Sequence, residues 1–296
     1  GQYGPFTNTY RLDFSTYTKE GTYYIKAGNA TSGLFKIAGN AYTGTADFVL
    51  RYMRQQRSGY NPFLKDSCHT KDGYIVYGPN EGAYMNVSGG WHDASDYLQY
   101  STTSANATYH LLAAYRDFPA VFNAAHQAKG DDGSNGLADV LDEARWGLDW
   151  LLKMHPREDY LFNQIADDRD HTRYRLPTLD SVDYGYGKGN GPPVYFITGE
   201  PQGLGKYKNR ATGFASTAGK FTSAFALGAT LFIGKDTALV PLLKKKALSA
   251  YALGRARPGV AQTAPMRAPY FYEEDNWVDD MELAAINLYN INRNAD

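Results

Sequence analysis

Hydrophobic and polar residues along the chain predict a short β-rich start followed by a longer helical part. Within residues 10–37, apolar and polar positions alternate and glycine-containing turns separate three short segments, which is typical of β-strands. After residue 40 the period of the pattern becomes helical, and Asn135 is a start signal for the third helical segment. The segments that predict helices are residues 43–57, 97–118, 135–152, 211–233, 236–253 and 279–291.

Long segments rich in glycine and tyrosine separate the predicted helices. They cover residues 61–91, 160–209 and 254–274, and we expect them to be irregular loops. Loops of this length in a compact domain usually carry function, so the pattern indicates a helical scaffold that displays a binding face. The chain has no alternation of strands and helices and no glycine-rich phosphate-binding motif, so nucleotide chemistry is not expected.

Composition narrows the class of partner. The formal net charge is −1, which favours neither nucleic acid nor an anionic membrane surface. No apolar run in the sequence approaches the roughly 18–20 residues of a membrane span. The chain contains 25 tyrosines, whose flat rings and hydroxyl groups suit sugar rings, although a tyrosine-rich core would give the same composition.

Two aspartates stand out in the segment SGGWHDASDYLQY, which follows the first long loop. Asp93 and Asp96 lie three residues apart, behind a Gly-Gly pair and beside a tryptophan and a histidine. Acidic residues in front of a predicted helix commonly cap its N-terminus. Paired carboxylates also serve in acid–base catalysis. The spacing alone leaves both interpretations open.

Several segments resemble glycoside hydrolase family 9, a family of inverting cellulases. GGWHDASDYLQY is similar to the segment that opens the active site in that family, and NGLADVLDEARWGLDWLLKMH is similar to one of its helices. NQIADDRDH, ASTAGKFTSAFALGA and YEEDNWVDDMELAAINLY follow in the family's order, so the resemblance covers about residues 41–292. The β-rich start and the segment KDSCHTKDG resemble the branch of the family that carries an N-terminal immunoglobulin-like module.

The resemblance implies a mainly α fold, an (α/α)₆ barrel of which the predicted helices make up about half. Residues 1–40 would be the end of the immunoglobulin-like β-sandwich, and residues 41–296 the N-terminal portion of the catalytic domain. The family's general acid is a glutamate in later segments, so we expect it beyond Asp296. Glu273 and Glu274 match a different part of the family and are not assigned that role.

The activity implied by the resemblance is hydrolysis of β-1,4-glucosidic bonds, with inversion, in cellulose or a related β-glucan such as xyloglucan. Inversion needs an acid and a carboxylate base on opposite faces of the sugar, roughly 6.5–9.5 Å apart. Residues as close in sequence as Asp93 and Asp96 cannot be that opposed pair. By the motif, Asp96 is the base that activates water and Asp93 positions the water. The alternative is a non-catalytic glycan-binding scaffold that lacks the acid.

Three further residues are candidates for contact with the glycan. His171 matches a loop that reaches the substrate in the family, and Trp277 matches a position that often carries a sugar-stacking aromatic residue. Trp91 lies next to the aspartates, where support of the loop from below competes with sugar contact. A polymeric substrate implies a secreted, periplasmic or cell-surface protein, and a start without methionine is expected of a processed or trimmed product.

Cys68, His69 and His92 are candidate metal ligands, although the chemistry itself needs no cofactor. The related branch holds a structural zinc with two cysteines and two histidines, a closed tetrahedral set. Here Ser58 stands where one of those cysteines is expected. The alternative is a buried thiol with hydrogen-bonded histidines. Calcium is the other metal of the family, for which the segments DRD (168–170) and EEDN (273–276) offer oxygen ligands.

Overall fold

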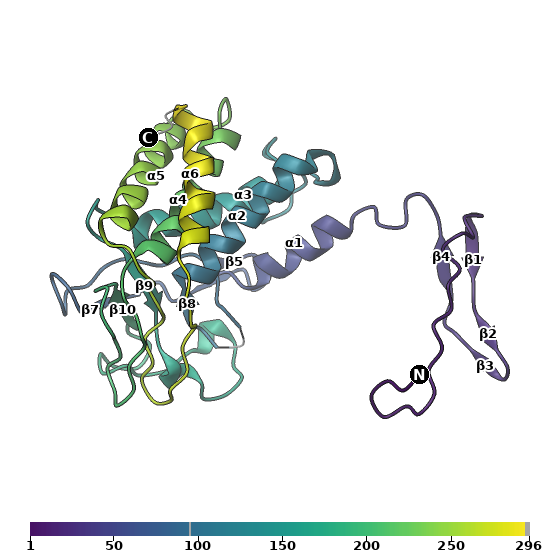
Figure 1. Ribbon diagram of the computed structural model, residues 1–296, viewed down its shortest axis with the longest axis horizontal. Coiled ribbons are helices and arrows are strands. Elements are labelled where there is room, and N and C mark those ends of the chain that lie inside the picture. Colours follow the sequence, from purple (N-terminus) through teal and green to yellow (C-terminus); the bar gives the residue numbers. More distant parts are fainter. Residues whose placement is uncertain (95, 294–296) are drawn as a thin grey trace. The chain divides into compact units, whose positions relative to one another are not determined.

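The computed structural model describes residues 1–94 and 96–293 (Figure 1). Ser95, within the aspartate segment, and residues 294–296, at the end of the predicted catalytic domain, lie outside the described residues. The chain divides into two compact units, Gly1–Thr45 and Ala46–Asp296. This division falls close to the change from β to helical pattern in the sequence.

The N-terminal unit is built on a ladder of short antiparallel strands. β1 (Gly21–Tyr23) pairs with β4 (Phe35–Ile37), and between them β2 (Lys26–Ala27) pairs with β3 (Ala30–Thr31). The strand expected near the start of this unit does not form, because residues 10–14 have no strand pairing and their side chains are exposed. An alternating pattern yields a strand only where a neighbouring strand pairs with it and one face is buried.

The second unit contains the six predicted helices. Asn135 does not begin the third helix: its side chain donates to Asp142 and accepts the N–H of Leu137, and the helix starts at Asp139. None of the described helices combines the length and apolar character needed to cross a membrane. The helices are α1 (Thr45–Gln55), α2 (Ser101–Asp117), α3 (Asp139–Met154), α4 (Ala215–Leu231), α5 (Leu239–Ala256) and α6 (Val278–Asn292).

Helix α4 forms the centre of this unit and packs against α2, α5 and α6 (Figure 1). Residues 215–229 are all buried, and most of them are alanine, glycine, serine or threonine. Small side chains allow neighbouring helices to approach closely: a Cβ on Gly228 would come within 2.9 Å of Leu148 and 3.1 Å of Leu243. A helix that is buried all round is expected at the core of a helical assembly.

A four-stranded sheet lies beyond one end of the helices and was not expected from the sequence (Figure 1). Its order is β7 (Tyr74–Val76), β10 (Pro193–Phe196), β9 (Phe162–Ile165) and β8 (Gln99–Tyr100). The prediction of irregular loops at residues 61–91 and 160–209 was therefore wrong in part. Strands this short give too few positions for a periodic pattern to be seen. Because β8 leads directly into α2, the sheet fixes the segment that precedes α2.

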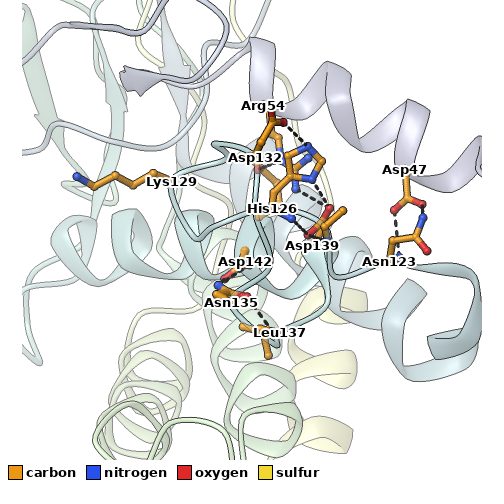
Figure 2. A network of polar contacts seen from close by, with 12 residues as sticks. Asp47, Arg54, Asn123, His126, Lys129, Asp132, Asn135, Leu137, Asp139 and Asp142 are labelled. Atoms are coloured by element: carbon orange, nitrogen blue, oxygen red, sulfur yellow. Dashed lines mark hydrogen bonds and ion pairs between the residues drawn. The ribbon is translucent and has the colours of Figure 1, made fainter.

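A buried polar network joins α1 to the start of α3 (Figure 2). The Asp139 carboxylate accepts a hydrogen bond from His126 at 2.6 Å and lies 3.3 Å from Arg54. One turn further along α3, Glu143 pairs with Arg57 at 2.6 Å, and neither side chain is exposed. These contacts hold the end of α1 against the helix that lies beneath the aspartate segment.

Candidate functional site

Asp93 and Asp96 lie in a tight turn at the end of the segment between β7 and β8. The N–H of His92 donates to the carbonyl of Gln56 at 2.8 Å, and the N–H of Asp93 donates to the carbonyl of Leu98 at 2.9 Å. Gly90 has φ of +72°, and a Cβ there would lie 2.7 Å from the Trp150 ring. Only glycine fits this close approach and this backbone conformation, which explains the second glycine of the Gly-Gly pair.

Both carboxylate oxygens of Asp93 accept hydrogen bonds from hydroxyl groups. Thr103, in the first turn of α2, donates to Oδ1 at 3.0 Å, and Tyr272 donates to Oδ2 at 2.6 Å. Burial and the bond to Asp93 raise the pKa of Tyr272, so its hydroxyl stays protonated and remains a donor. Asp93 is thus held in one orientation from two sides. Tyr272 lies 179 residues further along the chain and was not predicted, although it opens the segment YEEDNWVDDMELAAINLY that resembles the family.

Asp96 is half-buried and has a different environment. Its Oδ1 accepts the N–H of Leu98 at 3.3 Å, and its Oδ2 lies 3.2 Å from Nε2 of His171. Burial raises the pKa of Asp96, and the charge of His171 acts in the opposite direction. A raised pKa makes a carboxylate a stronger proton acceptor, which is the property required of a general base.

The capping interpretation of the two aspartates is wrong. The N-cap of α2 is Tyr100, and no side chain caps that helix end by a hydrogen bond. The Asp93 carboxylate instead accepts hydrogen bonds from two hydroxyl groups, those of Thr103 and Tyr272. The Asp96 carboxylate accepts the backbone N–H of Leu98 in its own loop. Capping of α2 therefore does not account for the spacing of the pair.

A hollow of about 250 Å³ opens beside Asp96. His171 and Tyr174 line it, and the Tyr174 side chain is 88% exposed. The ring of Tyr270 lies 6.1 Å from that of His171 and 6.2 Å from that of Tyr272. Exposed aromatic rings around a carboxylate suit a ligand with both apolar faces and hydroxyl groups, as sugars have. Sequence reasoning identified His171 but none of these tyrosines.

A buried ionic network positions the segment that carries His171. Asp170 accepts the N–H of Tyr97 and also pairs with Arg175, so it ties the aspartate loop to the His171 segment. Arg175 in addition pairs with Asp180 at 2.7 Å. The sequence offered no sign of these pairings, because their partners lie in separate irregular stretches.

The two tryptophan candidates differ in placement. Trp91 is 4% exposed, and its indole N–H donates to Glu143 at 2.7 Å. It therefore supports the loop from the α3 side, one of its two predicted roles, and the prediction of a sugar contact is wrong because a buried ring offers no face to a ligand. Trp277 is half-buried immediately before α6, and the described contacts do not join it to the aspartate loop.

The three predicted metal ligands come together. Cys68, His69 and His92 each offer a ligand atom, and these atoms all lie within 4.8 Å of one another. Burial lowers the pKa of His92 well below its ordinary value, so its imidazole is neutral, as a metal ligand must be. Burial acts the same way on His69, but the hydrogen bond with Asp180 and the nearby Cys68 and Asp72 outweigh it and raise its pKa to about 10, so His69 would have to release a proton to bind a metal.

Unpaired polar atoms near this cluster fit a metal. Within the described residues, Ser58 Oγ and His69 Nδ1 are buried without a hydrogen-bond partner. Ser58 precedes Gly59, which pairs with Cys68 across strands β5 (Gly59–Asn61) and β6 (Asp66–Cys68). Nε2 of His69 bonds to Asp180 at 3.0 Å, the kind of carboxylate partner that orients a ligating histidine.

The predicted calcium segments are engaged by protein groups. The Asp168 carboxylate accepts backbone N–H groups from residues 266–268. Glu273 pairs with Arg210, and Glu274 pairs with Lys220. Among the residues that the structure describes, the ligand cluster of Cys68, His69 and His92 is the one that gathers three or more such groups. The expectation of calcium at DRD or EEDN thus finds no cluster to hold it.

A helical barrel wall with a paired-carboxylate loop among exposed tyrosines defines a class of protein, the glycoside hydrolases. The sequence model of glycosyl hydrolase family 9 matches residues 42–296, and the chain belongs to this family. A cellodextrinase from Butyrivibrio fibrisolvens is 31% identical over 183 residues, covering 58% of this chain and 32% of the relative. A xyloglucan-specific endo-β-1,4-glucanase from Bacteroides ovatus is 28% identical over 161 residues, covering 50% of this chain and 27% of the relative.

The fold agrees with that of solved family members. A metagenome-derived family 9 endoglucanase superimposes with a TM-score of 0.73 and 27% identity, covering 96% of this chain and 49% of that protein. The predicted (α/α)₆ barrel, with about half of its helices in this chain, is thereby confirmed. The chain spans about a third of the length of the cellodextrinase and about half of the solved structure.

Proposed function

We propose that this chain carries the water-activating half of the active site of an inverting β-1,4-glucanase. The observation that carries the proposal is the contrast between the two aspartates: Asp93 is fixed by two hydroxyl donors, and Asp96 is half-buried with a raised pKa. The names of the relatives, a cellodextrinase and a xyloglucan-specific glucanase, support a β-glucan as substrate, in the form of an oligosaccharide or a polysaccharide.

In this mechanism Asp96 accepts a proton from water as the water attacks the anomeric carbon. Asp93 accepts the second hydrogen bond of that water and so sets the direction of attack. His171 and the exposed tyrosines around the hollow bind the sugar, with Trp277 as a further platform. The general acid that protonates the leaving oxygen is a glutamate expected beyond Asp296.

The other candidate function is a glycan-binding scaffold without hydrolysis. It applies if the full-length protein lacks the general acid; Glu273 and Glu274 pair with Arg210 and Lys220 and are not assigned that role. We further propose a secreted, periplasmic or cell-surface location, since the substrate is a polymer, and a relation of the N-terminal strands to an immunoglobulin-like module.

Asp96→Asn in the full-length protein tests the catalytic proposal. The assay is release of reducing ends from a soluble β-glucan, with the anomeric form of the first product read by proton NMR. We expect loss of nearly all hydrolysis by Asp96→Asn, no change for Glu81→Gln, an exposed carboxylate, and an α-anomer from the unmodified protein. Hydrolysis that survives in Asp96→Asn would refute the assignment, and β-glucan binding without hydrolysis by the unmodified protein would establish the scaffold instead.

We also propose that Cys68, His69 and His92 hold a structural zinc, with Ser58 or a water at the fourth position. A bound zinc would link the β5–β6 hairpin to the aspartate loop, because His92 immediately precedes Asp93. The support for this proposal is the orphaned Oγ of Ser58, the orphaned Nδ1 of His69 and the neutral state of His92.

A further inference from the structure

A second hollow, which we call the arginine cleft, adjoins the hollow beside Asp96. Its volume is about 390 Å³, and four arginines and a single carboxylate are among the residues that line it. Thr172 and Arg173 line both hollows, so the two lie next to each other on this segment of the chain. The charged residues of the arginine cleft are Arg169, Arg173, Arg175, Arg267 and Asp183.

Two of these arginines are already paired and form the fixed part of the cleft. Arg169 pairs with Asp167 at 2.6 Å, and Arg175 pairs with Asp180 at 2.7 Å. The carboxylates of these pairs neutralise the guanidinium groups, so this part of the lining holds the shape of the cleft and adds little free charge.

The other two arginines have no such partner among the described residues. The side chains of Arg173 and Arg267 are exposed, and among the described residues the ion pairs of this lining involve only Arg169 and Arg175. The one acidic residue of the lining, Asp183, already accepts the backbone N–H groups of Gly185 and Gly187. Two free guanidinium groups at one cleft favour a planar anion, because the guanidinium fork matches a carboxylate in a bidentate pair.

We propose that the arginine cleft binds the carboxylate of a uronic acid unit carried by a β-glucan chain. The inference rests on the proposed function, since a chain with one unit at Asp96 would reach the cleft along the wall formed by Thr172 and Arg173. A volume of about 390 Å³ lies in the range of small-molecule pockets and admits a sugar unit. Arg173 and Arg267 are then specificity-determining residues that select acidic over neutral glucans.

The test is a comparison of two probes of equal length, a neutral cello-oligosaccharide and one oxidised to the carboxylate at C6. Binding of each to the full-length protein is measured by calorimetry in about 20 mM and about 0.5 M NaCl, below and above physiological screening. We expect the oxidised probe to bind about tenfold more tightly at low salt, as two exposed charge pairs allow, and to lose most of that advantage at high salt.

The decisive variant is the double substitution Arg173→Gln and Arg267→Gln. It should remove the preference for the oxidised probe and leave the affinity for the neutral probe within about twofold. The matched control, Lys235→Gln with Lys245→Gln, removes the same charge from exposed positions at and before α5 and should keep the preference.

The outcomes separate this inference from the proposed function. Equal binding of both probes by the unmodified protein would overturn the inference, as would a preference for the oxidised probe that persists in the arginine double variant. In both cases, binding of the neutral probe would still support a glucanase. Failure of the unmodified protein to bind either probe would overturn both. Loss of the preference in the lysine control would also overturn the inference, since general charge would then explain it.

Discussion

Removal of the Tyr272 hydroxyl tests the idea that Asp93 acts only when it is held in place. The substitution Tyr272→Phe deletes the donor that lies 2.6 Å from Asp93 Oδ2 and retains the ring, which packs edge-on against Tyr100 at 4.9 Å. A hydrogen bond to a charged group contributes about 1.5–3 kcal/mol. Tyr272 and Asp93 are both half-buried and reachable by water, so we take values at and just below the lower end of this range, about 1–2 kcal/mol.

If that free energy is lost in the transition state, kcat falls about 5- to 30-fold, since 1.36 kcal/mol corresponds to tenfold. KM for a soluble β-glucan should stay nearly unchanged, because the hydroxyl orients the water-binding carboxylate and is not itself proposed to bind sugar. The assay is steady-state hydrolysis by the full-length protein, with circular dichroism to verify folding. Tyr52→Phe, which deletes an exposed hydroxyl on α1, is the matched control.

Thr103→Val provides a second arm, since it removes the donor to Asp93 Oδ1 at 3.0 Å while keeping the shape of the side chain. The two donors hold the same carboxylate, so their effects should be coupled and fail to add in the double variant. A folded Tyr272→Phe protein with kcat within about twofold of the unmodified protein would refute the reasoning, as would a rise in KM with unchanged kcat.

Three further results are expected. Removal of the imidazole in His171→Ala should raise the pKa of Asp96 further, because the charge of His171 lowers it; the base must be ionised, so the acidic limb of kcat/KM against pH should move to higher pH. Glu143→Gln should lower the free energy of unfolding by about 3–5 kcal/mol in denaturant titrations, because Arg57 is left buried with its charge uncompensated. Ser58→Cys should increase zinc affinity in competition with a chromogenic chelator, and zinc should then raise the melting temperature, because thiolate is a better zinc ligand than a hydroxyl group.

Controls and opposing outcomes accompany each of these results. An acidic limb that stays in place or moves down in His171→Ala would contradict the 3.2 Å pairing with Asp96. For the buried pair, Arg116→Ala is the control, since its pairing with Asp117 is exposed and should contribute at most about 1 kcal/mol. Equal zinc affinity with and without the Ser58→Cys change would argue against Ser58 as the fourth position.

The sequence by itself determined the features that depend on local pattern. Helical periodicity located the six helices, because an amphipathic stripe repeats often enough over such lengths to be recognised. The motif around Asp93 and Asp96 marked the acidic pair, and the resemblance to the zinc-holding branch of the family marked Cys68, His69 and His92, a cluster that the fold does assemble. Short patterns were less reliable. At residues 10–14 the pattern predicted a strand that does not form, and it did not predict strands β7 to β10.

Only the tertiary structure decided what surrounds those residues. The hydroxyl of Tyr272 reaches Asp93 across 179 residues, and Asp170 ties the aspartate loop to the His171 segment through partners in separate stretches. The same is true of the burial that raises the pKa of Asp96 and that removes Trp91 from the surface. Periodicity and motifs record what a residue does for its own helix or loop, whereas burial and pairing depend on which distant segments the fold brings against it.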